Sequence, residues 1–166
     1  SDDAPEKCSV GEIVSDSLDL CKEKFTVSGI KVELHREHLD CPVTCRRVEL
    51  SQVLLNLLNN SYFAVKSQTE PWVKIAVTKK SKTVKILVSD SGPGVPEDIQ
   101  KKLFQPFFTT KPVGQGIGLG LSLRKGIVES HGGTLEFNER SEHSEFCIEL
   151  PLTLAGESAA LVIFWL

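Results

Sequence analysis

The sequence has 166 residues, which is enough for one domain with a substantial core. Hydrophobic residues make up 40% and charged residues 25%, and these ordinary values exclude a chain that is disordered throughout. The net charge of −3 gives no electrostatic reason to expect nucleic acid as a partner, and no apolar run is long enough to span a membrane. The sequence contains no Met and opens on acidic residues rather than a basic leader, so we expect a cytoplasmic fragment of a longer protein.

The cysteines do not form a recognisable metal or disulfide pattern. Their number is odd, and the pair at 41 and 45 has no second Cys or His pair at the spacing of a zinc site. We therefore expect reduced thiols at all five positions, which are Cys8, Cys21, Cys41, Cys45 and Cys147.

Hydrophobic periodicity predicts alternating helices and strands along the chain. In order, these are a helix over 10–25, a strand over 30–34, a long helix over 48–65, strands over 73–77 and 84–88, a short helix near 96–104, a helix over 119–130, and strands over 135–137 and 146–150. Helices interleave with strands and one hairpin, which predicts a mixed sheet with helices packed on one face. We expect one domain over 1–154 and an apolar tail over 155–166, which is an extra strand, a docking segment for a partner chain, or an artefact.

The long helix over 48–65 carries an unusual polar face. Its apolar residues fall on one stripe, formed by Leu50, Leu54, Leu57, Leu58 and Val65. Asn56, Asn59 and Asn60 gather on the other side, although Asn is a poor helix former. Asn56 and Asn60 lie one turn apart and can offer amide oxygens to a hard cation. A merely solvated polar face remains the alternative for this helix taken alone.

The strand over 84–88 leads into Asp90-Ser91-Gly92-Pro93-Gly94. An Asp followed by glycines at a strand end is usually a turn. The functional interpretation is a carboxylate that accepts a hydrogen bond from a ligand, with Gly92 and Gly94 allowing close approach to the backbone.

Aromatic residues precede the main glycine-rich segment, in Leu103-Phe104-Gln105-Pro106-Phe107-Phe108-Thr109-Thr110-Lys111. Such a segment can plug the core or form the hinge of a lid, and its chemistry alone does not decide between the two.

Glycines then alternate with other residues in Gly114-Gln115-Gly116-Ile117-Gly118-Leu119-Gly120, directly before the helix over 119–130. Backbone amides at such a helix start suit phosphate groups. The spacing does not fit the dinucleotide fingerprint or a P-loop. A flexible linker is the alternative, but Ile117 and Leu119 are unusual in one. The segment therefore favours a phosphate cradle.

These four features, in this order, resemble the catalytic ATP-binding domain of sensor histidine kinases, over roughly residues 9–152. They correspond to that family's N box, first glycine box, F box and second glycine box. The stretch Gly126-Ile127-Val128-Glu129-Ser130-His131-Gly132-Gly133 is similar to the nitrogen-regulator-like branch. The resemblance implies the Bergerat ATP-binding fold, a two-layer α/β sandwich of the α+β class.

The resemblance also implies a role for each box. Asp90 would bind the adenine amino group in a pocket shaped by Gly92 and Gly94, and Asn56 and Asn60 would hold Mg²⁺ and phosphate oxygens, with Asn60 as the first choice of metal ligand. Thr109, Thr110 and Lys111 would belong to a mobile lid over the phosphates, and Phe107 and Phe108 would anchor it. The second glycine box would also bind the nucleotide, through Gly116, Ile117, Gly118, Leu119 and Gly120, and its glycines would let the lid fold over the phosphates.

The sequence departs from the family pattern at two places. Many relatives have Lys or Arg where this chain has Phe63, although Lys66 lies close by. None of the four histidines precedes an acidic residue as a phosphoacceptor would. We expect His35 and His38 to be exposed and His131 to cap the end of its helix.

The resemblance thus predicts the ATP-binding half of a histidine kinase. Its γ-phosphoryl acceptor would be a histidine on a separate dimerisation domain, and a response regulator would act downstream. ATP-hydrolysing switches such as DNA gyrase are the closest rival, but they carry a Glu where this chain has Asn56, and an amide cannot act as a base. A nucleotide-sensing module that has lost catalysis is the second rival.

Overall fold

The computed structural model describes residues 4–109 and 120–154. The elements in chain order are β1 (Glu6–Ser9), α1 (Val10–Val27), β2 (Lys31–Leu34), β3 (Pro42–Cys45), α2 (Arg47–Val65), β4 (Trp72–Lys79), β5 (Thr83–Asp90), α3 (Glu97–Gln100), α4 (Gly120–Ser130), β6 (Thr134–Phe137) and β7 (Glu145–Pro151). Every predicted helix and strand is present, and their bounds differ from the prediction by a few residues. The apolar tail predicted over 155–166 lies outside the described residues.

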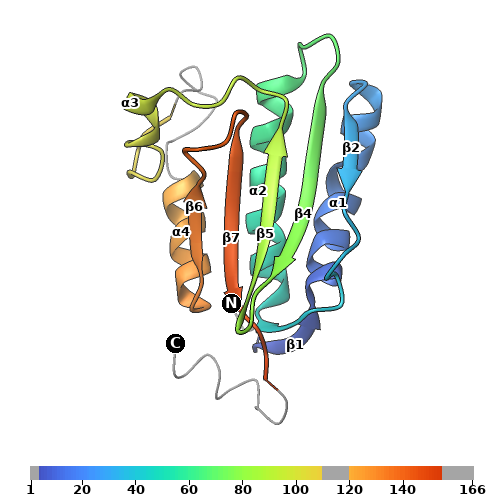
Figure 1. The fold of residues 1–166 in the computed structure, drawn as a ribbon, viewed down its shortest axis with the longest axis vertical. Coiled ribbons are helices and arrows are strands. Elements are labelled where there is room, and N and C mark those ends of the chain that lie inside the picture. The colour runs from blue at the N-terminus through green and yellow to red at the C-terminus, as the bar shows by residue number, and fades with distance from the viewer. Residues whose placement is uncertain (1–3, 110–119, 155–166) are drawn as a thin grey trace.

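The main sheet has five strands in the order β2-β4-β5-β7-β6. Strands β2 and β4 run parallel, and the other neighbours are antiparallel. Helices α1, α2 and α4 lie side by side behind one face of this sheet, and no helix of the described residues covers the other face (Figure 1). The predicted mixed sheet with helices on one face is therefore confirmed.

The core lies between the sheet and the helices. On β5 and β7 every second side chain points into it, including Val84, Ile86 and Ile148. The alternation stops at the end of β5, where Val88, Ser89 and Asp90 are all buried. A buried carboxylate therefore stands where the central strand leaves the sheet.

The long helix α2 lies across the middle of the sheet. All five residues of its predicted apolar stripe are buried. Helix α1 beside it begins with a capping box, in which Ser9 and Glu12 each bind the other's backbone N–H. By contrast, α2 has no side-chain cap of its own at Arg46.

A second, two-stranded antiparallel sheet joins β1 to β3 at the lower end of α1 and α2 in Figure 1. This sheet was not predicted. It brings the sulfur atoms of Cys8 and Cys45 to 3.2 Å, and all five cysteines are free. No helix in the described part of the chain is long and apolar enough to cross a membrane.

Candidate functional site

Asp90 is the acidic residue of the predicted site, and only 3% of its surface is exposed. Its Oδ1 accepts the backbone N–H of Gly92 at 2.8 Å, and the hydroxyl of Ser61 on α2 is a second hydrogen-bond partner. Burial raises the pKa of this carboxyl, whereas the hydrogen bonds from Ser61 and Gly92 and the nearby His143 oppose the rise. The carboxylate is thus held in place and partly desolvated, as a specific hydrogen-bond acceptor should be.

The two glycines of this loop are required for different physical reasons. A Cβ at Gly92 would lie 2.7 Å from Asp90 Oδ1, so only glycine leaves room for the carboxylate to fold back. Gly94 has a φ of +83°, in the left-handed region that other residues rarely adopt. Both positions therefore require glycine for the loop conformation itself.

Residues that the sequence did not single out brace the same loop. Ser91 Oγ accepts the N–H of Trp72 at 3.0 Å and contacts Gln68 Oε1 at 2.5 Å, and Gln68 Nε2 donates to the Ser91 carbonyl. His143 lies 3.1 Å from the Gly92 carbonyl through Nδ1, and its ring meets Trp72 edge to face. These contacts join the segment between α2 and β4, the start of β4 and the β6–β7 loop to Ser91 and Gly92, so no local pattern could have revealed them.

The three asparagines of α2 separate into two groups. Asn59 accepts a hydrogen bond from Lys24 of α1 at 2.5 Å, so it serves the contact between helices. Asn56 and Asn60 are both half-buried, and Asn56 lies against the beginning of α4. Asn56 Oδ1 is fully buried and has no hydrogen-bond partner in the part of the chain that the structure describes. A buried acceptor of this kind is costly without a ligand, which distinguishes Asn56 from a solvated polar face.

Phe63 lies beyond these asparagines and is 52% exposed. Two ammonium groups lie over its ring, Lys66 Nζ at 5.0 Å and Lys24 Nζ at 5.9 Å from the centroid. Tyr62 meets the same ring edge to face at 5.3 Å. The position that is basic in many relatives therefore has cations next to it, held by aromatic rings.

Helix α4 begins at Gly120, which lies close to α2. A Cβ atom at Gly120 would lie 3.8 Å from Asn56 Nδ2. At the other end, His131 is 1% exposed. Its Nε2 accepts the N–H of Arg46 at 3.1 Å, and its Nδ1 lies 2.8 Å from the Ile127 carbonyl. The predicted capping role is confirmed, and His131 additionally caps α2, which has no side-chain cap of its own.

The aromatic segment over 103–109, after which the described residues break off, is only partly packed. Phe104 meets Phe146 edge to face at 6.4 Å, and Lys125 Nζ lies 4.8 Å from the Phe104 ring centroid. Phe107 is 75% exposed with a φ of +66°, so the anchoring that we expected of it is made here by Phe104. Phe108 is half-buried, and Thr109 is exposed.

Six predicted site residues lie outside the described part of the chain: Thr110, Lys111, Gly116, Ile117, Gly118 and Leu119. His35 and His38 are exposed, as the sequence predicted. No group of three or more His, Cys, Asp or Glu side chains within the described ranges could hold a metal ion.

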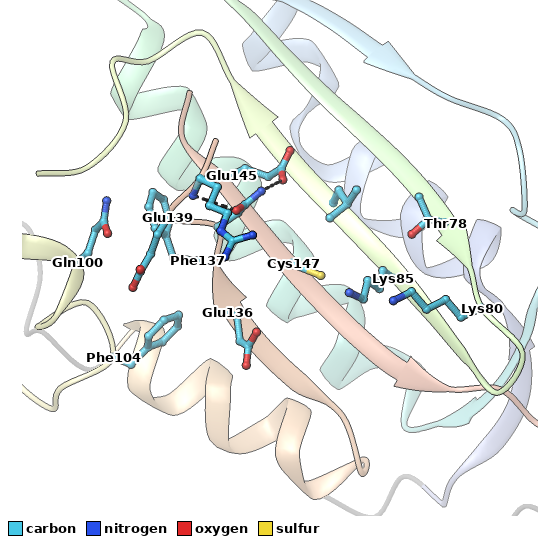
Figure 2. A pocket seen from close by; sticks show the side chains of 13 residues that line it. Thr78, Lys80, Lys85, Gln100, Phe104, Glu136, Phe137, Glu139, Glu145 and Cys147 are labelled. Carbon is cyan, nitrogen blue, oxygen red and sulfur yellow. Dashed lines mark hydrogen bonds between the residues drawn. The ribbon is translucent and has the colours of Figure 1, made fainter. Parts of the chain in front are cut away.

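A hollow of about 810 Å³ lies on the other face of the sheet (Figure 2), and neither Asp90 nor Asn56 is among the residues that line it. Leu87 and Cys147, which pair across β5 and β7, line it together with charged side chains such as Lys85 and Glu136. Asn138 bridges its rim by donating to Glu145 at 2.7 Å. Of the predicted site residues that the structure describes, none lines this hollow, although Phe104 of the aromatic segment does.

Comparison with known proteins gives a consistent result. Residues 45–154 match the family described as histidine kinase-, DNA gyrase B- and HSP90-like ATPases. The chain is 34% identical over 152 residues to the sensor protein TdiS of Thauera aromatica, covering 87% of this chain and 27% of TdiS. It is 33% identical over 136 residues to the sensory histidine kinase/phosphatase NtrB of Rhizobium meliloti, covering 74% of this chain and 35% of NtrB. The chain thus spans about a third or less of the length of these curated relatives.

Solved structures agree with the sequence matches. The nucleotide-free catalytic domain of histidine kinase ThkA superposes with a TM-score of 0.79 at 30% identity, over 90% of this chain and 99% of that domain. ThkA in complex with the response regulator protein TrrA matches with a TM-score of 0.74 at 30% identity, over 90% of this chain and 42% of ThkA. The chain therefore belongs to the histidine kinase-, DNA gyrase B- and HSP90-like ATPase family, as the ATP-binding catalytic domain of a histidine kinase.

Proposed function

We propose that this domain binds Mg·ATP and provides it for transfer of the γ-phosphoryl group to a histidine on a dimerisation domain outside these 166 residues. A response regulator would then accept the phosphoryl group, and the domain would act in the cytoplasm. The buried carboxylate of Asp90, fixed by Ser61 and the Gly92 N–H, is the observation that carries this proposal. Its position suits one donor of a nucleotide base.

The proposal assigns adenine recognition to Asp90, with Gly92 and Gly94 shaping the pocket. Adenine presents an exocyclic amine to the carboxylate, whereas guanine presents a carbonyl oxygen at the corresponding position. Two opposed acceptors in a desolvated site cost free energy, so the site should prefer adenine. The bracing contacts from Ser91 and His143 support this role, because a recognition loop must keep its geometry.

Mg²⁺ and the phosphates would be held by Asn56 and Asn60, with Gly120 at the start of α4. The unpartnered, buried Asn56 Oδ1 fits this group, since amide oxygens are suitable ligands for a hard cation. Mg²⁺ supplies charge neutralisation at the phosphates, the main requirement of phosphoryl transfer besides positioning. We assign Phe107 and Thr109, with 110, 111 and 116–119, to the nucleotide-binding segment from the resemblance alone.

The residues present favour a kinase over an ATP-hydrolysing switch. Asn56 stands where the hydrolysing relatives place a Glu, and its amide cannot take a proton from water. The second rival, a nucleotide-sensing module that has lost catalysis, would differ from a kinase in the reaction and not in nucleotide binding. It would bind nucleotide and yet fail to phosphorylate the dimerisation domain of its own parent protein.

Calorimetric titration tests the binding part of this proposal. The chain should bind Mg·ATP and Mg·ADP, and GTP should bind at least tenfold more weakly. A matched titration without Mg²⁺ should show weaker binding of ATP but nearly unchanged binding of adenosine. Equal affinity for ATP and GTP would contradict the role of Asp90.

A further inference from the structure

Only two side-chain nitrogen or oxygen atoms in the described part of the chain are both buried and without a hydrogen-bond partner. They are Asn56 Oδ1 and Arg124 Nε. The proposed function accounts for the first atom but gives no role to Arg124. A guanidinium N–H that is buried without an acceptor is costly, so its presence needs a reason.

Two contacts fix how α4 lies against α2. Gly120, at the beginning of α4, lies against Asn56, whereas His131, just after its end, binds the N–H of Arg46. The two helices are therefore antiparallel neighbours. At about 100° per residue, Arg124 lies within about 40° of Gly120 and about 20° of His131 around the α4 axis. Arg124 consequently shares the face of α4 that meets α2.

The next residue provides a contrast. Lys125 lies about 100° further around α4, and its Nζ donates to the Leu135 carbonyl of β6 at 3.2 Å. It also lies over the ring of Phe104. Lys125 therefore faces β6 and the aromatic segment at Phe104, whereas Arg124 faces α2, so the two adjacent cations have different surroundings.

The direction of a helical side chain indicates where the guanidinium goes. Side chains in an α-helix lean toward the helix N-terminus, which in α4 is Gly120 beside Asn56. Glu49, the acidic residue in the first turn of α2, already pairs with Arg46 at 2.7 Å. The end of the α2–α4 interface toward which Arg124 leans thus combines an unused amide acceptor, an unused N–H donor and a helix start.

We propose that Arg124 is a phosphate-binding residue, whose buried Nε–H donates to a phosphate oxygen of the bound nucleotide beside Asn56. This inference rests on the proposed function, because it places the phosphates at the start of α4. An ordered guanidinium suits this task, since its N–H groups form a rigid fork that matches phosphate oxygens. It also explains how the site can do without a basic residue at Phe63.

Titration of wild-type protein and of three variants with adenosine and Mg·ATP tests the inference. Arg124→Gln should weaken Mg·ATP at least tenfold and change the affinity for adenosine less than twofold. Arg124→Lys keeps the charge but not the fork, and should lose less. The matched control is Lys125→Gln, which removes the same charge from the adjacent position on α4 and should leave the Mg·ATP affinity within twofold of wild type.

The outcomes are distinguishable from one another. Equal losses for adenosine and Mg·ATP in Arg124→Gln and Arg124→Lys, with a lowered melting temperature, would show a structural residue and overturn the inference. Unchanged Mg·ATP affinity, or an equal loss in Lys125→Gln, would overturn it as well while leaving the proposed function intact. Failure of the wild-type protein to bind Mg·ATP would overturn the proposed function and this inference together.

Discussion

At the scale of single residues, folding places the carboxyl group of Asp90 in a buried position that is unfavourable for its charge. Burial penalises its charge, and the hydrogen bonds from Ser61 and the Gly92 N–H only partly compensate, which raises its pKa. A carboxyl whose pKa is raised by folding favours the folded state below its ordinary value of 3.8. That contribution is lost as the pH rises through the raised pKa, so the ionised group reduces stability at neutral pH.

Replacing the carboxylate should therefore separate stability from binding. Asp90→Asn should weaken Mg·ATP at least tenfold, yet the variant should unfold at an equal or higher denaturant concentration at pH 7. Its advantage over wild type should shrink as the pH falls through the raised pKa to about 3, below the ordinary value of 3.8, where Asp90 becomes mainly protonated in both states. Urea unfolding across this range measures the effect, and a variant whose stability relative to wild type is lower at pH 7 than at about pH 3 would contradict it.

A pair of glycine substitutions tests the loop in the same way. Gly92→Ala places a Cβ 2.7 Å from Asp90 Oδ1, so the carboxylate must move and nucleotide affinity should fall at least tenfold. Gly126→Ala is the matched control, because no atom lies within 4 Å of its Cβ in the exposed middle of α4. It should stabilise the protein by about 0.5–1 kcal/mol through helix propensity, without changing affinity. Unaltered affinity in Gly92→Ala would show that Asp90 does not need its present position.

At the scale of elements, a neutral imidazole joins the start of α2 to the end of α4. His131 Nε2 accepts from Arg46, which requires the proton on Nδ1, where it can be donated to Ile127. Burial lowers the pKa of this histidine, opposed by the Ile127 carbonyl and by Glu49 and supported by Arg46. Protonation at Nε2 would break the cap of α2, so the two helices should separate more easily at acid pH.

Stability should follow this protonation. A histidine with a pKa lowered by folding contributes stability that is complete above its ordinary value of 6.5 and is lost as the pH falls through the lowered pKa. His131→Ala should cost about 2–4 kcal/mol at pH 7.5, because it leaves a cavity and two unpaired backbone groups. Its cost should decrease below pH 6.5. Exposed His35→Ala serves as the control, and an equal cost for His131→Ala at every pH would refute the mechanism.

The elements also show what a sequence can and cannot predict. The long, strongly periodic helix α2 and the hairpin strands β4 and β5 were predicted to within a few residues. Strands β1 and β3 were missed, because four residues each give too little alternation and their pairing spans about 37 positions. At the site, Asp90, Gly92 and Asn56 follow from motif spacing. Ser61 and His143 do not, because only the fold brings them to the loop.

At the scale of the whole molecule, the two faces of the sheet differ in what lies against them. The helical face holds the core and the candidate site, in the space around α2, α4 and the end of β5 (Figure 1). The opposite face carries the hollow lined by Leu87, Cys147 and charged side chains. Substituting Cys147→Ser there should leave nucleotide affinity within twofold of wild type, as a calorimetric titration can verify. A large loss would mean that the two faces are coupled.

The central claim is that this domain provides ATP for phosphorylation of a histidine that it does not itself contain. Incubation with γ-labelled ATP and Mg²⁺, alone and together with the dimerisation domain of the parent protein, tests this most directly. The account predicts no label on the isolated chain and acid-labile, base-stable label on the added domain. Label of that kind on the isolated chain, or release of free phosphate without any labelled dimerisation domain, would contradict it.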